Sequence, residues 1–416
     1  MNPSTVLIII IGYFALLLSI SYVTSRNATN LTFFLGNRQS PWYIVAFGMI
    51  SATLSGVTFI SVPGYVMNSQ FSYMQIVLGY LLGYFVIANI LMPMYYRLNL
   101  TSIYTYLEKR FGKSSYKAGA SFFMLSRTIG AAFRLFIIAN VLQITLFNQW
   151  NIPFEATVVI TILLIWLYTF KGGIRTIIWT DSLQTLFMLT AVGITVYMIT
   201  QELDMSFSGM VNSVADSNHS KIFFLENWNG EYHFIKQFLS GAFIAIVMTG
   251  LDQDMMQKNL SCRNIKEAKK NMYWFSVALI PVNLMFMSLG ALLIIYAKRE
   301  GIPLPEQSDD LFPIIATQGY LTPAVGIFFL IGIVAAAYSS ADSALTALTT
   351  SFTVDILNTK SMEEKPLKRL RKKVHVGMSV LLVIIILIFN AVNDEAVISA
   401  LFTVAGYTYG PLLGMY

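Results

Sequence analysis

Residues 335 to 357 read AAAYSSADSALTALTTSFTVDIL, and the residues directly before them read IFFLIGIV. Together they are long and apolar enough to cross a bilayer as one helix, which takes about 20 residues. Small oxygen-bearing side chains recur in this stretch at steps of three or four, so they share one helix face. They are Ser339, Ser340, Asp342, Ser343, Thr346 and Thr350. The stretch predicts a membrane span with a continuous oxygen-rich face.

Apolar stretches of similar length recur along the whole chain. The 416 residues are 56% hydrophobic and only 12% charged, with a mean hydropathy of +0.64, whereas soluble proteins are about a quarter charged. We therefore predict an all-α protein, a polytopic transmembrane bundle that forms a single domain over residues 1 to 416. The expected spans are 4 to 25, 42 to 67, 71 to 96, 118 to 145, 155 to 170, 177 to 200, 234 to 257, 271 to 297, 322 to 354, 374 to 392 and 396 to 416.

The distribution of basic residues predicts how this bundle is oriented. When alternate loops are assigned to opposite sides, one set holds most of the 27 lysines and arginines, and the other holds only Lys221, Lys236, Lys298 and Arg299. The positive-inside rule then predicts a protein of the cell membrane whose amino terminus lies outside and whose basic loops lie on the cytoplasmic side. The net charge of +6 thus reflects topology, not nucleic-acid binding. The basic run PLKRLRKK, residues 366 to 373, predicts an anchor beside anionic lipid.

Motifs for enzyme chemistry are incomplete in this sequence. FGKSS at residues 111 to 115 lacks the earlier glycine of a phosphate-binding loop, because that position is Leu107. The three histidines do not have the spacing of zinc ligands. We therefore expect a protein that is not an enzyme.

Ionisable residues within the spans are candidate functional residues, because each costs at least about 2.5 kcal/mol near the bilayer centre. Four are singled out: Arg127, Arg134, Asp181 and Asp342. The guanidinium of Arg134 could hold a substrate carboxylate through two hydrogen bonds, or it could pair with a structural partner. Arg127 lies closer to the cytoplasmic end of the same span, and a structural role is the favoured interpretation there.

The oxygen-rich face also has two interpretations. Small hydroxylated residues allow membrane helices to pack closely, and this is the favoured interpretation for Thr350 and Thr353. For the segment from Ser339 to Ser343, the acid favours a site for a cation such as Na⁺, which carboxylate, hydroxyl and carbonyl oxygens can hold. Spacing alone does not separate a sodium site from a proton relay.

The second span is predicted to break within the membrane. Its sequence, MISATLSGVTFISVPGYVM from Met49 to Met67, is polar between residues 51 and 58 and then contains Pro63 and Gly64. Irregular backbone at membrane depth is tolerated where it lines a cavity, so this segment predicts a binding site. The last span is expected to break at AGYTYGPLLG.

These motifs resemble the sodium:solute symporter family. The resemblance rests on KGGIRTIIWTDSLQTLFML from Lys171 to Leu189, TGLDQDMMQKNLSCRNIKEA from Thr249 to Ala268, and the stretch quoted first. It implies a core of five plus five helices in inverted repeats, spanning residues 42 to 416, with one extra N-terminal helix at 4 to 25. Members usually continue beyond this core, so the end of this chain within core helix ten predicts a truncated product.

The resemblance also implies where the coupling ion, Na⁺, binds. The family's common site would lie on the backbone carbonyls of Ser51, Leu54 and Ala336 and the hydroxyls of Ser339 and Ser340. A second sodium ion, as in some members, would bind at Asp181, Asp342 and Ser343. Asp342 occupies a position where relatives are expected to carry a small residue, so this second ligand set departs from the family pattern.

Within the family, the chain is most similar to bacterial sialic acid symporters. The similarity lies in SATLSGVTFIS, in Phe71 with Gln75, and in SRTIGAAFRLFIIANVLQ. It implies that an acidic sugar would be held by Ser55, Thr58, Phe71, Gln75 and Arg134.

The predicted function is sodium-coupled import of a small organic anion, sialic acid first, by alternating access. Another solute is an alternative, such as a neutral sugar, proline or a monocarboxylate. A sensor that retains the transporter fold is a less favoured alternative, because the sequence contains no signalling domain and keeps the cation ligands. A channel is also less favoured, because polar residues gather at mid-depth instead of forming a continuous pore.

Overall fold

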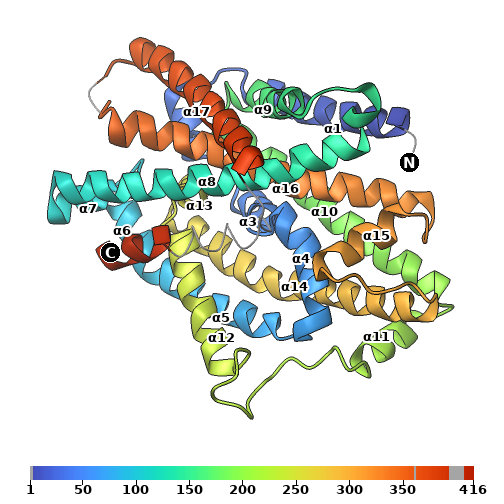
Figure 1. Cartoon of the computed structure of the whole chain (residues 1–416). Coiled ribbons are helices and arrows are strands. Elements are labelled where there is room, and N and C mark those ends of the chain that lie inside the picture. Colours follow the sequence, from blue (N-terminus) through green and yellow to red (C-terminus); the bar gives the residue numbers. More distant parts are fainter. Residues whose placement is uncertain (1–2, 360–361, 393–406) are drawn as a thin grey trace.

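A computed structural model describes residues 3–359, 362–392 and 407–416. Within these ranges the regular elements are helices, and the structure adds one isolated bridge between Ser40 and Cys262. Figure 1 shows the helices packed side by side in one bundle. The predicted all-α bundle is therefore confirmed.

Seven helical segments in the described ranges are long and apolar enough to cross a membrane. They are α1 (Pro3–Thr24), α5 to α6 (Tyr73–Val86 and Met92–Arg97, joined by a π-turn), α8 (Lys113–Thr145), α10 (Ile174–Glu202), α14 (Ile265–Arg299), α16 (Pro323–Ser351) and α17 (Glu364–Val392). The helix α9 (Phe154–Thr169) is apolar but shorter. All of these lie where spans were predicted. The proposed division into one extra helix and a ten-helix core stays a prediction.

The second predicted span is broken, as expected. It consists of α3 (Trp42–Thr53) and α4 (Gly56–Ser69), which meet at a 58° bend. The backbone leaves the helical region at Leu54, with φ −88° and ψ 83°, and at Ser55, with φ −66° and ψ 171°. The break therefore falls in the polar segment, whereas Pro63 lies inside α4.

A second broken span was not predicted. Residues 234 to 257 were expected to form one helix, but α12 (Phe234–Ala245) and its π-turn are followed by α13 (Gln253–Leu260) at a bend of 68°. Asp252 starts α13 because its carboxylate accepts hydrogen bonds from the backbone N–H groups of Asp254 (2.9 Å) and Met255 (3.3 Å). An acid at this position is a strong helix-start signal that the prediction overlooked.

The remaining short helices lie between the spans. They are α2 (Asn30–Leu35), α7 (Thr105–Phe111), α11 (Phe207–Ala215) and α15 (Leu311–Thr317). The first half of the predicted last span, 396 to 416, lies outside the described residues, and so does the start of its expected break at AGYTYGPLLG. The described part of that motif, residues 407 to 414, is continuous helix, so the expected break does not occur there.

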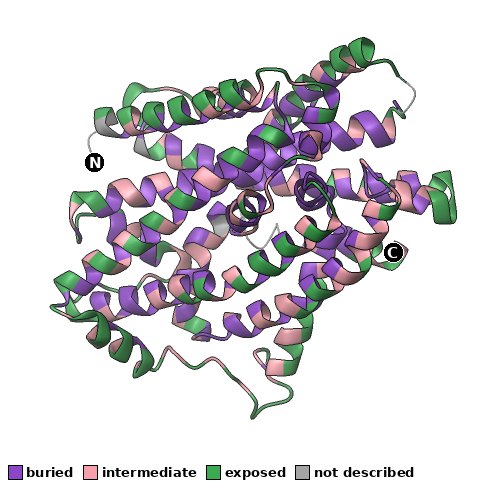
Figure 2. Ribbon diagram, turned by 180° about the vertical axis from the view of Figure 1, so that it is seen from behind, coloured by how far each residue is buried: buried purple, intermediate pink, exposed green. Residues whose placement is uncertain are grey.

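Helix α16 runs through the centre of the bundle, where α10, α8, α4 and α3 pack against it. Its residues from Ile333 to Ser351 are all buried. Figure 2 shows the complementary pattern on the outer helices, whose outward faces are exposed and whose inward faces are buried. The oxygen-rich face of α16 is therefore enclosed by protein, which is the condition for a binding site at membrane depth.

Candidate functional site

Two glycines bring the broken span close to its neighbours. A Cβ atom on Gly48 would lie 3.0 Å from the Asp181 side chain, and one on Gly56 would lie 2.7 Å from the Cβ of Ala337. Real Cβ contacts are longer, so larger residues would push α3 from α10 and α4 from α16. The break between α3 and α4 is thereby held against the polar faces of both long helices.

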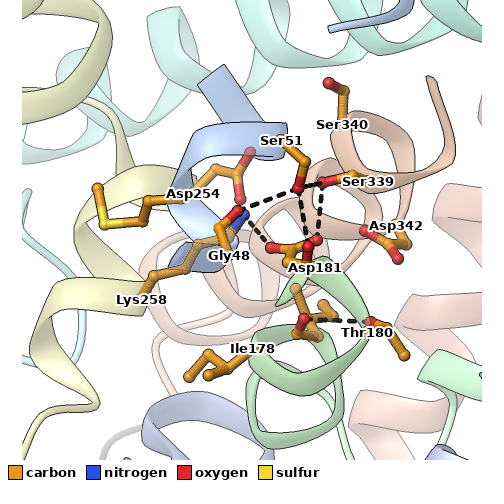
Figure 3. Close-up of polar contacts among 12 residues, drawn as sticks. Gly48, Ser51, Ile178, Thr180, Asp181, Asp254, Lys258, Ser339, Ser340 and Asp342 are labelled. Atoms are coloured by element: carbon orange, nitrogen blue, oxygen red, sulfur yellow. Dashed lines mark hydrogen bonds and ion pairs between the residues drawn. The ribbon is translucent and has the colours of Figure 1, made fainter. Parts of the chain in front are cut away.

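A continuous hydrogen-bonded group of oxygens joins α3, α10 and α16 (Figure 3). The Ser51 hydroxyl lies 2.9 Å from the Ser339 hydroxyl, and Ser51 Oγ also donates to the backbone carbonyl of Asp181 at 3.0 Å. Ser339 Oγ donates to Asp181 Oδ1 at 2.8 Å. All three side chains are buried. The structure thus brings together residues from both predicted sodium sites.

Carbonyl oxygens lie next to this group. Because α3 ends at Thr53, the last carbonyls of that helix, including those of Ser51 and Leu54, lack partners within it. On α16 the Ser340 hydroxyl approaches the Ala336 carbonyl at 3.5 Å, a long contact that leaves both oxygens able to bind a cation. The predicted first sodium site therefore has its ligand types on facing helices.

The predicted second site contains buried oxygens without a hydrogen-bond partner. Asp342 Oδ2 accepts from the Tyr168 hydroxyl at 2.7 Å, whereas its Oδ1 and the Ser343 hydroxyl have no partner among the described residues. Unpaired buried oxygens are costly, and coordination of a cation would satisfy them. These residues therefore fit a hard cation such as Na⁺.

Lys258 also contacts this group, although it follows the predicted span 234 to 257 and was therefore expected in a basic loop. Its ammonium nitrogen lies 2.7 Å from Asp181 Oδ2, and both side chains are 1% exposed. Lys258 reaches α10 because the bend at Leu251 and Asp252 turns α13 back into the bundle. With the predicted span 234 to 257 taken as one straight helix, this contact could not be predicted.

Arg127 has two acidic partners at the start of α13, the short helix that also carries Lys258. It forms ion pairs with Asp254 and, at 3.7 Å, with Asp252, which also accepts a hydrogen bond from the Tyr409 hydroxyl at 3.0 Å. The structural interpretation of Arg127 fits these contacts. Asp252 and Asp254 were missed, although the sequence contained the signal: both carboxylates fall inside the predicted span 234 to 257.

Arg134 lies two turns further along α8 and has no ion pair within the part of the chain that the structure describes. Its Nε is buried without a hydrogen-bond partner. At the break, Ser55 precedes α4 without capping it, and its hydroxyl lies 3.4 Å from that of Thr58. These three residues keep polar groups available for a ligand.

Phe71 and Gln75 make their contacts elsewhere. Gln75 Nε2 donates to the Tyr232 carbonyl at 2.9 Å, and its Oε1 accepts from the Phe224 backbone at 3.2 Å. Phe71 lines an apolar cavity between α10, α11 and α14. The structure does not show these two residues in contact with Ser55, Thr58 or Arg134, so their predicted role in substrate binding stays a prediction.

Comparison with known proteins gives the family. A model of the sodium:solute symporter family matches residues 33–414. The chain belongs to the sodium:solute symporter family. It is therefore a sodium-coupled, multi-pass membrane transporter, as the sequence motifs predicted.

Relatives of this symporter include two bacterial proteins. It is 28% identical to the sodium/sialic acid symporter of Proteus mirabilis, over 98% of this chain and 83% of that protein. It is 26% identical to the sodium/sialic acid symporter of Aliivibrio fischeri, over 95% and 78%. A solved structure of a Na⁺-coupled sialic acid symporter, substrate-bound and outward-open, superposes with a TM-score of 0.84 at 21% identity, over 98% of this chain and 85% of that one. This last likeness shows the fold.

Proposed function

We propose that this symporter couples the entry of Na⁺ to the import of a small organic anion, sialic acid first, by alternating access. The observation that carries the proposal is the buried oxygen group of Ser51, Ser339 and Asp181, which lies where the broken span meets α10 and α16. A cation bound there contacts three helices at once. Its arrival or departure therefore changes how these helices pack.

The charge balance of the buried site favours a bound cation. Four buried carboxylates and three basic side chains lie on, or at the start of, the helices α8, α10, α13 and α16. These residues are Asp181, Asp252, Asp254 and Asp342, with Arg127, Arg134 and Lys258. If all are ionised and no anionic substrate is bound, the group carries one negative charge in excess, and a single Na⁺ neutralises it. Burying an uncompensated charge is unfavourable, so the cation stabilises the site.

An anionic substrate is supported by Arg134 and by the start of α4. Arg134 has no acidic partner among the described residues, and a carboxylate taken from water into a membrane cavity needs such a cation. The first N–H groups of α4 are unsatisfied within the helix and carry a partial positive charge, which also suits a carboxylate. The two bacterial relatives named as sialic acid symporters make sialic acid the first candidate.

The same proposal includes the orientation and location of the protein. The positive-inside rule supports a cytoplasmic position for the loops that carry most of the basic residues, with the amino terminus outside. We place the protein in the cytoplasmic membrane of a bacterial cell, because its two named relatives come from bacteria.

The test is substrate binding by an Arg134→Ala variant. Loss of one partner of a buried charged pair costs about 3–5 kcal/mol, which is at least about a hundredfold in affinity. We expect the variant to lose sialic acid binding, measured by calorimetry in detergent, while a Na⁺-induced rise in unfolding temperature persists. Arg134→Lys serves as the matched variant and should also bind poorly, because a point charge does not replace the two-pronged guanidinium.

Uptake into proteoliposomes distinguishes the alternatives. An inward Na⁺ gradient should drive accumulation of labelled sialic acid, and unlabelled proline, neutral sugars and monocarboxylates should not compete. Competition by one of them would identify a different solute. Wild-type affinity of Arg134→Ala for the acid would contradict the anionic substrate, and Na⁺-independent flux would indicate a channel.

A further inference from the structure

A small cationic cavity lies away from the transport site, at the end of the bundle that carries the basic loops. Its volume is about 260 Å³, below the range of about 300–1,000 Å³ that is usual for drug-sized ligands. It forms where the segment after α1, the turn between α9 and α10, and the first turns of α17 meet. Its lining residues are Ser25, Arg26, Asn27, Ala28, Lys171, Lys368, Arg371 and Lys372. Five of these eight are lysine or arginine.

Arg371 is the buried member of this lining. Its side chain is 1% exposed, and its guanidinium carbon lies 4.1 Å from the centre of the Phe33 ring, so one face of the group is covered. Its Nη1 has no hydrogen-bond partner among the described residues. A buried N–H group without an acceptor is unfavourable, and a bound anion would supply that acceptor.

The five cations lack acidic partners in the described ranges of the chain. Lys368 approaches the Ala28 carbonyl at 3.4 Å, and Lys372 lies over the Phe170 ring at 4.8 Å. Glu364, at the start of α17, interacts with Arg371 electrostatically but forms no ion pair with it, and its carboxylate accepts a hydrogen bond from the Asn30 backbone at 2.8 Å. One acid near five cations leaves the cavity with an excess of positive charge.

We propose that this cavity binds a phosphate group, with Arg371 at its floor and Lys171 and Lys368 at its rim. Guanidinium and ammonium groups together match the several acceptor oxygens of phosphate. The phosphate belongs either to the headgroup of an anionic phospholipid or to a free anion in solution. Exposed Tyr22 and Val23, directly before the cavity-lining segment on α1, offer an apolar surface along which acyl chains could lie.

This site differs from the diffuse attraction that a basic membrane-facing segment exerts on anionic lipid. Diffuse attraction depends to a similar degree on every basic residue from Lys365 to Lys373. The cavity is instead lined by Lys368, Arg371 and Lys372 of α17, whereas Lys365 and Arg369 of the same helix do not line it. The two sets of residues provide a matched comparison.

The experiment measures phosphate binding by the purified full chain in a zwitterionic detergent. Thermal unfolding is followed during titration with phosphatidylglycerol, with phosphatidylcholine, and with inorganic phosphate. The variants are Lys171→Gln with Lys368→Gln, Arg371→Gln, and the control pair Lys365→Gln with Arg369→Gln. Each rim charge removed should lower the affinity for phosphatidylglycerol about fivefold, so the first pair should lose about 25-fold. The control pair should change it by less than about threefold.

The outcomes decide both the site and the source of the phosphate. Stabilisation by phosphatidylglycerol that the rim pair loses and the control pair keeps supports a lipid headgroup. Saturation by inorganic phosphate, without a further effect of the lipid, supports a free anion in the same cavity. Equal losses in the rim and control pairs, or equal effects of phosphatidylglycerol and phosphatidylcholine, would overturn the proposal. Because the two rim lysines are exposed, this result does not depend on whether Arg371→Gln folds.

Discussion

The ion pair between Lys258 and Asp181 makes a quantitative prediction. The two charged atoms lie 2.7 Å apart, and each side chain is 1% exposed, so water cannot replace a lost partner. Removing one member of such a pair leaves a buried charge and costs about 3–5 kcal/mol, whereas replacing both members is often close to neutral. We therefore expect Lys258→Met and Asp181→Asn each to be strongly destabilising in the absence of Na⁺. The double variant should recover most of that loss.

The assay is a double-mutant cycle of thermal unfolding in detergent, performed without Na⁺ and then at increasing Na⁺. Lys266→Met is the matched control, because Lys266 is exposed in the first turn of α14, and such surface changes usually remain within about 0.5 kcal/mol. If the effects of the two single substitutions simply add in the double variant, the pair does not stabilise the ion-free protein.

The same variants test whether Lys258 and Na⁺ compete for the carboxylate of Asp181. The ammonium of Lys258 already contacts Asp181 Oδ2, so a sodium ion at the predicted second site must compete with it or use the remaining oxygens. Lys258→Met removes the competitor and leaves Asp181 in need of a cation. Na⁺ should therefore stabilise Lys258→Met more than it stabilises the wild type. An equal or smaller effect of Na⁺ would contradict this competition.

Three further predictions concern other parts of the molecule. Ser339→Ala removes the hydrogen bonds to Ser51 and Asp181 and should raise the half-saturating Na⁺ of uptake about 5- to 100-fold, whereas Thr353→Val, whose hydroxyl only contacts its own helix, should not. Gly56→Val should destabilise the protein by about 1–3 kcal/mol in thermal unfolding, because a Cβ there meets Ala337, whereas Gly12→Ala has open space and should be neutral. Burial raises the pKa of the Asp309 carboxyl, which accepts a hydrogen bond from Ser61. A raised native pKa means that ionised Asp309 opposes folding above its unfolded pKa, so Asp309→Asn should raise the unfolding temperature at neutral pH, and this gain should vanish in acid. A gain that persists below about pH 4 would contradict that cause.

Much of the architecture follows from local sequence. Apolar length determines where helices cross the membrane, because each backbone polar group in lipid must be satisfied within its own segment. The polar residues 51 to 58 weaken the second span at the point where it breaks, and the spacing of Ser339, Asp342 and Ser343 on one face depends only on helical periodicity. The family motifs then brought Asp181 into the same predicted site. These inferences need no knowledge of how the helices pack.

The contacts that complete the site depend on tertiary structure. Lys258 was expected in a loop, and it reaches Asp181 only because the chain bends at Leu251 and Asp252 and returns α13 to the centre of the bundle. The same bend brings Asp252 and Asp254 to Arg127, while the packing of α5 against the segment 221 to 232 engages Gln75. Sequence periodicity describes one helix at a time, whereas the partner of a buried charge is set by the distance between atoms on different helices. Only the folded chain decides which charges pair and which, like Arg134 and Arg371, form no ion pair within the described residues.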